Sequence, residues 1–135
     1  MNLGNTTELS LYVFDTTTRT GRVVQYPFPM PLLSIIPHEH SLVFGSVVPD
    51  KTGGVYHLME LDAEGNIIRT KQGTLNMQND PVKVLPGAGG QYILFYQYNK
   101  KTNDSSVMRG SLLGADWEVK KQLQYGFKHD ADLDI

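Results

Sequence analysis

Apolar and polar residues alternate along most of the chain. Leu9, Leu11 and Val13, for example, alternate with Ser10 and Tyr12. This period of two is that of a half-buried strand, whereas the period of an amphipathic helix is almost absent. The pattern therefore predicts an all-β fold. The predicted strands lie at 9–13, 23–24, 32–36, 42–48, 55–61, 67–68, 82–85, 92–98, 107–113 and 117–123.

Turn-forming residues separate these strands and are spaced closely enough for antiparallel hairpins. They are Thr20-Gly21, Asp50–Gly54, Glu64–Asn66, Pro86-Gly87 and Asn103-Asp104. The glycine-rich stretch after Pro86 is one of these turns and not a phosphate-binding loop. A phosphate loop continues with Lys and Ser or Thr, whereas a run of strand formers follows here.

Two parts of the chain, 34–48 and 83–99, repeat one pattern. Ile36-Pro37 aligns with Leu85-Pro86, and the strand after the turn aligns as well, following a loop that is longer in the second copy. The two loops are therefore predicted to be equivalent turns between strands.

A third, partial copy begins the chain. The stretch FDTTTRTGRVV resembles LDAEGNII, with Asp15 over Asp62, and further on Trp117 aligns with Asn66. The repeating unit is thus four strands in about 48 residues. The chain contains the last two strands of one unit, followed by two complete units.

Four-stranded units of this length resemble the blades of β-propellers. LYVFDTTTRTGRVV in particular is similar to the outer hairpin of quinoprotein-like and NHL-like blades. The resemblance implies a single all-β unit, 1–135, with a partial blade at 8–27, blades at 30–74 and 79–124, and a tail or the start of a further strand at 125–135. The marks of WD40 and sialidase blades are missing, so the resemblance implies a scaffold and no particular activity.

Two other architectures fit an all-β chain of this length: a closed up-and-down barrel and a β-sandwich. A barrel of about eight to ten strands needs no partner, but it gives no reason for the repeat. The propeller-type blade is therefore the preferred prediction.

An arc of about two and a half blades does not close, because a propeller needs at least about four. Leu42–Val48 and Ile93–Tyr98 carry apolar residues on both sides, as expected of strands buried on both faces. Something must then cover the terminal faces of the arc. The occupant is another copy, another chain or a further part of a longer protein.

The charge of the 135-residue chain is −2 and its pI is near 6.0, which gives no electrostatic reason to expect nucleic acid. The chain has no Cys, and no apolar run reaches the ~18 residues of a membrane span. No secretion signal is visible at the N-terminus, so the cytoplasm is the default location. A secreted or periplasmic protein whose signal has been removed would show the same sequence.

Two groups of residues are weak candidates for metal ligands. His38 and His40 are alternate residues, which share a side on an extended chain. Asp130, Asp132 and Asp134 resemble the start of a calcium loop, but the Gly and Glu that complete such a loop are missing. An exposed polar turn and a solvated acidic tail are the preferred interpretations, so no metal site is predicted.

Aromatic residues gather late in the chain and offer a candidate binding surface: Tyr92, Tyr96, Tyr98 and Trp117. Flat aromatic faces suit sugars, small ligands and proteins, although packing between blades is the commoner role. No nucleophile elbow is present and no carboxylate pair is evident, so no enzyme activity, catalytic residue or cofactor is predicted.

The leading functional hypothesis is a non-enzymatic interaction or scaffold protein. The alternatives are a small-ligand or glycan-binding domain, and part of a larger propeller enzyme or receptor.

Overall fold

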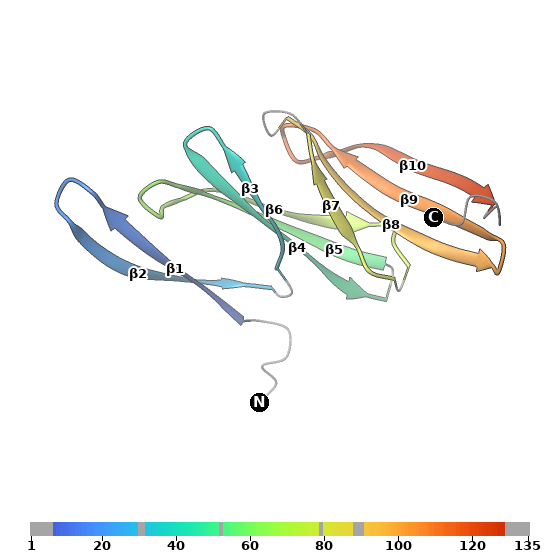
Figure 1. Ribbon diagram of the computed structural model, residues 1–135, viewed down its shortest axis with the longest axis horizontal. Coiled ribbons are helices and arrows are strands. Elements are labelled where there is room, and N and C mark those ends of the chain that lie inside the picture. Colours follow the sequence, from blue (N-terminus) through green and yellow to red (C-terminus); the bar gives the residue numbers. More distant parts are fainter. Residues whose placement is uncertain (1–6, 30–31, 52, 79, 88–90, 129–135) are drawn as a thin grey trace. The chain divides into compact units, whose positions relative to one another are not determined.

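The computed structural model describes residues 7–29, 32–51, 53–78, 80–87 and 91–128. These residues form ten strands and no helix, so the all-β prediction is confirmed (Figure 1). The strands are β1 (Thr7–Asp15), β2 (Thr20–Phe28), β3 (Leu32–His38), β4 (Ser41–Asp50), β5 (Gly53–Asp62), β6 (Ile67–Leu75), β7 (Lys83–Pro86), β8 (Ile93–Thr102), β9 (Ser105–Leu113) and β10 (Val119–Lys128).

The strands form a hairpin, β1–β2, and two four-stranded sheets, β3-β4-β5-β6 and β7-β8-β9-β10. Within each sheet, strands that are consecutive in the chain are neighbours, which is the order of a simple meander. The pairs β1–β2, β3–β4, β7–β8, β8–β9 and β9–β10 are antiparallel. Each sheet keeps two edges, so the described strands form no closed barrel.

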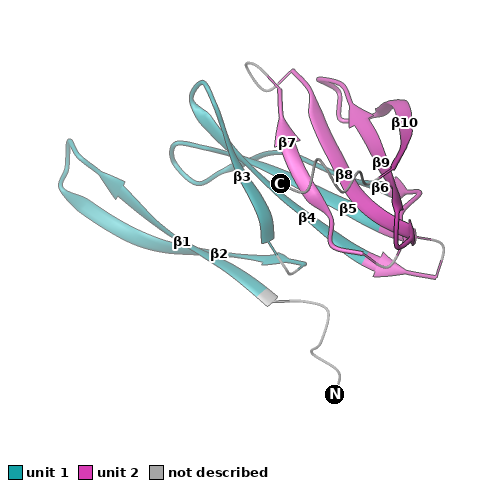
Figure 2. Cartoon of the chain, turned by 45° about the vertical axis from the view of Figure 1, so that its right-hand side comes forward, with its two compact units in different colours: residues 1–48, 55–73 teal, residues 49–54, 74–135 magenta. Residues whose placement is uncertain are grey.

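The chain divides into two compact units, drawn in teal and magenta in Figure 2. The first comprises residues 1–48 and 55–73, which include the hairpin β1–β2 and most of the sheet β3–β6. The second comprises residues 49–54 and 74–135, which include the sheet β7–β10. Strand β10 runs past the predicted end of the last blade at residue 124.

The two hairpins that align in the sequence have the same register. Pro37 lies opposite Leu42 in β3–β4, and Pro86 lies opposite Ile93 in β7–β8. The β3–β4 turn is tight, with His38 opposite Ser41. The aligned prolines therefore stand at equivalent places in the two sheets.

The β1–β2, β5–β6 and β9–β10 turns each contain a residue in the left-handed region, Arg19 (φ 57°), Gly65 (φ 85°) and Trp117 (φ 63°), as does the β3–β4 turn at Glu39 (φ 47°). Gly65 donates its N–H to the Asp62 carbonyl at 3.1 Å, and Trp117 donates its N–H to the Gly114 carbonyl at 2.9 Å. Trp117 therefore occupies the place of Gly65. The sequence alignment had placed it over Asn66, one position later.

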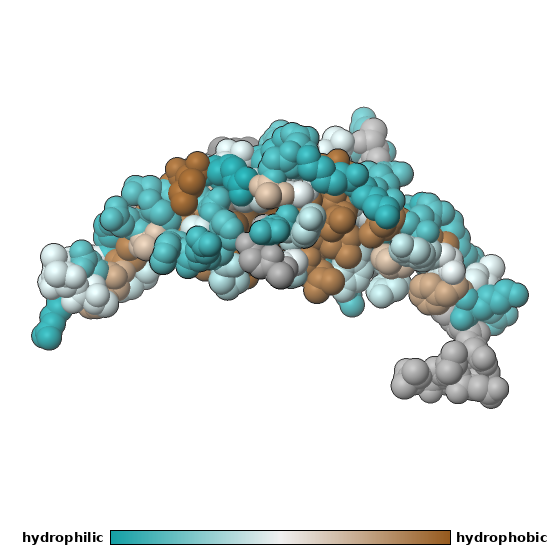
Figure 3. Space-filling model, turned by 90° about the horizontal axis from the view of Figure 1, so that it is seen from above, coloured by the Kyte–Doolittle hydropathy of each residue, from teal (hydrophilic) through white to brown (hydrophobic). Residues whose placement is uncertain are grey.

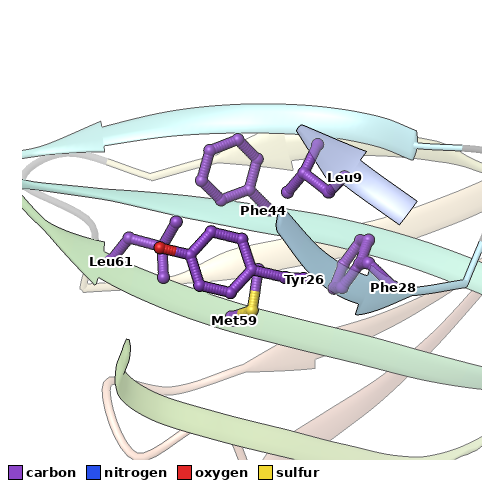
Figure 4. Close-up of a cluster of buried hydrophobic side chains, with 6 residues drawn as sticks. All are labelled: Leu9, Tyr26, Phe28, Phe44, Met59 and Leu61. Carbon is purple, nitrogen blue, oxygen red and sulfur yellow. The ribbon is translucent and has the colours of Figure 1, made fainter. Parts of the chain in front are cut away.

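In the first unit, the hairpin packs on the sheet through a buried apolar cluster. Leu9, Tyr26 and Phe28 come from the hairpin, and Phe44, Met59 and Leu61 come from β4 and β5 (Figure 4). The Tyr26 hydroxyl donates to the Gly65 carbonyl, and the Arg22 guanidinium donates to the Glu64 carbonyl. The hairpin is thus held by buried apolar side chains and by two hydrogen bonds to the β5–β6 turn.

In the second unit, a buried amide holds the segment before β7. The Gln97 side chain donates to the carbonyls of Gln78 and Asp80, both at 3.0 Å, and accepts from the Gln78 N–H at 2.6 Å. Asn99 donates to the Asp80 carboxylate at 2.6 Å. The three bonds of Gln97 satisfy backbone groups of Gln78 and Asp80 that lie outside the strand pairings.

Gly65→Ala is expected to lower the free energy of unfolding by about 1–2 kcal/mol. A Cβ atom there would lie 3.1 Å from Val13 and 3.2 Å from the Tyr26 hydroxyl, in a conformation that favours glycine. Urea unfolding measures the change. Gly126→Ala is the control, since a Cβ at Gly126 meets nothing within 4 Å and should change stability by less than about 0.5 kcal/mol. Equal losses in the two variants would contradict the packing described at the turn.

Candidate interaction surface

One face of the sheet β7–β10 carries a continuous set of apolar and aromatic side chains. Its registers place Leu85 opposite Leu94, Tyr98 opposite Met108, and Met108 opposite Tyr125. Opposite residues share a face, and so do alternate residues along each strand. We call this set the tyrosine face: Leu85, Leu94, Tyr96, Tyr98, Met108, Leu112, Leu123, Tyr125 and Phe127.

The tyrosine face is open to solvent on strands β7, β8 and β10. Leu85, Tyr98, Tyr125 and Phe127 are all exposed. Figure 3 shows hydrophobic side chains (brown) among hydrophilic ones (teal) at the surface seen from above. The aromatic rings support one another, because Tyr98 makes edge-on contacts with Tyr96 at 5.9 Å and with Phe127 at 6.1 Å between ring centroids.

The opposite face of the same sheet is buried along β8 and at the end of β9, whereas Gln122, Gln124 and Lys128 of β10 are exposed on that face. Ile93, Phe95 and Leu113 are buried there, together with the hydrogen-bonded amides of Gln97 and Asn99. Strand β8 is therefore covered on one side only. Strand β4 differs, because every residue from Val43 to Val47 is buried, as predicted for a strand covered on both faces.

The structure brings together two of the four aromatic residues predicted to form a binding surface. Tyr96 and Tyr98 lie on the tyrosine face, whereas Tyr92 is exposed just before β8. Trp117 is 1% exposed, so its ring is not available to a ligand. This burial weakens the glycan-binding hypothesis, which counted Trp117 among four candidate surface aromatics.

The β10 part of the tyrosine face was not predicted from the sequence, because the last blade was expected to end at residue 124. A usable signal was present in the chain. Gln25-Tyr26-Pro27-Phe28 recurs as Gln124-Tyr125-Gly126-Phe127.

His38 and His40 do not share one side of an extended chain. Glu39 has a φ of 47°, so the chain turns between His38 and His40, and the argument from an extended chain does not apply. No group of three His, Cys, Asp or Glu residues in the described ranges is placed to hold a metal ion. Asp130, Asp132 and Asp134 lie outside the described residues.

His38 instead joins a cluster around a buried carboxylate. Glu60 Oε2 lies 3.2 Å from His38 Nδ1 and accepts a hydrogen bond from Ser41 at 2.5 Å, while Glu60 Oε1 lies 3.3 Å from Arg69 Nη2. Burial alone would raise the pKa of Glu60. The hydrogen bonds from Ser41 and His38 and the positive charge of Arg69 outweigh burial, so the pKa of Glu60 lies below its ordinary value.

This cluster predicts a pH dependence of stability. A carboxylate whose pKa is lower in the folded than in the unfolded protein stabilises the fold fully above its ordinary pKa of 4.5. That stabilisation is lost as the pH falls from there through the folded pKa. Glu60→Gln should lower the free energy of unfolding at pH 7 by about 1–3 kcal/mol and flatten its decline between about pH 5 and pH 3.

Urea unfolding at a series of pH values measures both effects of Glu60→Gln. Glu39→Gln is the matched control, because it removes a carboxylate from the exposed turn beside the cluster. An unchanged acid slope in Glu60→Gln, or an equal change in Glu39→Gln, would contradict the role assigned to Glu60.

A groove of about 440 Å³ lies between β1 and the β3–β4 turn, within the first unit. Its lining is mainly apolar and comes from Leu11, Val13, Pro37, Leu42, Phe44 and Leu61. Because the hairpin has two strands and the sheet has four, the hairpin covers only part of the sheet. Ile35 and Leu42 are exposed on the part of the sheet that it does not cover. Glu39, His40 and Asp62 also line the groove. Asp62 is engaged in its own turn, where it accepts from the N–H groups of Glu64 and Asn66, both at 2.9 Å.

No protein-family model, curated protein or solved structure matches this chain. In the part of the chain that the structure describes, no helix is long and apolar enough to cross a membrane.

Proposed function

We propose that the protein is a non-enzymatic interaction protein built of propeller-type blades, whose open terminal faces dock on other β-sheet surfaces. Three features support blades as the unit. Both four-stranded sheets are meanders, and their first hairpins share one register. The hairpins β1–β2, β5–β6 and β9–β10, which end the three sequence repeats, each turn through a left-handed residue. A blade packs both of its faces on neighbours.

The observation that carries the proposal is a pair of aligned residues with opposite burial. Ile36 lies opposite Val43 in the first sheet, and Leu85 lies opposite Leu94 in the second. Ile36 is 3% exposed, whereas Leu85 is 56% exposed. The same position is thus part of a packed face in one sheet and part of an open face in the other. An open apolar face of this kind marks an interaction site.

Static light scattering across a range of concentrations tests the proposal, together with binding of an apolar fluorescent dye such as ANS. We expect a mass above the 15.1 kDa of one chain at micromolar concentration, and dye binding that falls as the chains associate. A single chain that also fails to bind the dye would reject the proposal, because it would have no accessible apolar face.

A further inference from the structure

Strand β10 repeats the side chains with which β2 docks the hairpin onto its sheet. In β2 these are Arg22, Val24, Tyr26 and Phe28, and in β10 they are Lys121, Leu123, Tyr125 and Phe127. The registers agree as well. Tyr26 lies opposite Leu9, and Tyr125 lies opposite Met108, each on the preceding strand.

The two sets differ in what covers them. Tyr26 is 7% exposed and lies in the apolar cluster, with its hydroxyl on the Gly65 carbonyl. Tyr125 is 57% exposed. Phe28 and Phe127 differ in the same way, at 3% and 44%. Strand β10 therefore carries a docking surface of the β2 type that is open.

The complementary surface also occurs twice. Strand β2 docks on Met59 and Leu61, next to the turn that ends at Gly65. With Asp15 aligned to Asp62, Tyr12 and Phe14 of β1 take the places of those two apolar residues.

The face of the hairpin that carries Tyr12 and Phe14 is open. Tyr12 is 67% exposed, whereas Met59 is 4% exposed. The Tyr12 and Phe14 rings stack at 6.4 Å between centroids, and Arg19 supplies the left-handed residue that Gly65 supplies in the sheet.

We propose that β10 docks on the outer face of the β1–β2 hairpin of a second copy of this chain, as β2 docks on the sheet within one copy. This inference rests on the proposed function and names its partner. In the contact, Tyr125 and Phe127 cover Tyr12 and Phe14. The Tyr125 hydroxyl donates to the carbonyl of Arg19, the counterpart of Gly65. The contact is head to tail, so copies close into a ring or continue as a chain.

Charge favours this pairing over contact between two tyrosine faces. The registers place Lys83, Lys100 and Lys121 on the same side of the sheet as the tyrosine face. Two such faces brought together would place like charges opposite each other. The outer hairpin face carries Glu8 instead, its other strand positions carry no Lys or Arg, and the one cation of the contact, Arg19, lies in the turn at its end. The outer hairpin face of a second copy therefore offers the Lys-bearing tyrosine face an apolar surface with a negative charge.

The test separates the two faces by mutation and recombines them. Tyr125→Asp removes the β10 surface, and Tyr12→Asp removes the hairpin surface. Both side chains are mainly exposed, so each variant should retain the wild-type circular dichroism spectrum. Sedimentation velocity should show each variant alone with association at least tenfold weaker than wild type. An equimolar mixture should form a 1:1 complex, because one intact contact remains.

A second pair, Phe127→Asp and Phe14→Asp, guards against a local folding defect in the first. The control is Ile68→Asp, an equally exposed apolar residue on the outer strand of the first sheet, which should assemble like the wild type. Assembly of Tyr12→Asp with loss of assembly in Tyr125→Asp would mean contact between two tyrosine faces and would overturn the inference. A wild-type chain that stays single but binds ANS would also overturn it, while leaving the proposed function in place.

Discussion

Replacing Trp117 with alanine is expected to lower the free energy of unfolding by about 3–5 kcal/mol. The ring is almost fully buried, and it is the largest side chain so buried among the described residues. Truncation removes its apolar contacts and leaves a cavity that the surrounding strands cannot fill completely. Urea unfolding followed by far-ultraviolet circular dichroism measures the loss, because the chain has no other tryptophan for fluorescence.

A comparison of two variants separates packing from backbone strain at this turn. Trp117 has a φ of 63°, which costs an alanine as much as a tryptophan but costs a glycine little. Trp117→Gly should therefore be more stable than Trp117→Ala by about 1 kcal/mol. Arg19→Gly is the control at an equivalent exposed turn, where strain is relieved without loss of packing and stability should rise. A glycine variant less stable than the alanine variant would contradict the left-handed assignment.

Replacing Phe44 with alanine is expected to cost about 3–5 kcal/mol and to release the hairpin first. Phe44 lies in the cluster where Leu9, Tyr26 and Phe28 pack on the sheet. Hydrogen exchange should show the amides of β1 and β2 losing protection before those of β4 and β5. Phe44→Leu should cost less than about 1.5 kcal/mol, because it keeps most of the apolar volume. Loss of protection spread evenly over the first unit would contradict the docking role of Phe44.

Most strands were predictable because alternation and turn residues are local signals. Strand β4 was expected at 42–48 and spans Ser41–Asp50. Asp15 was expected to open the first turn, and β1 ends there, whereas Thr20-Gly21 was expected in the turn but belongs to β2. The Asp15 carboxylate stabilises the turn, because it accepts from the N–H groups of Thr17 at 2.8 Å and Thr18 at 3.3 Å.

The candidate surface was only partly predictable from the sequence. Tyr96 and Tyr98 alternate along one strand, so their shared face follows from the period of two. Trp117 was expected at the start of a strand but occupies a buried turn position, which local propensity does not indicate. Alternation also assigns residues to two faces without saying which face is covered. Leu85 is exposed and Ile36 is buried, and this difference depends on what covers each face, which local pattern does not encode.

Cross-linking tests most directly whether β10 contacts the hairpin of another copy. A photoreactive p-benzoyl-phenylalanine in place of Phe127 reacts with whatever lies against the tyrosine face. Mixing isotopically heavy and light chains identifies the cross-links that join two copies. We expect mixed heavy-light cross-links from position 127 to residues 12–21. Cross-links from position 127 that reach only β7–β10 of another copy, or no mixed cross-link at a concentration where the chains associate, would contradict the claim.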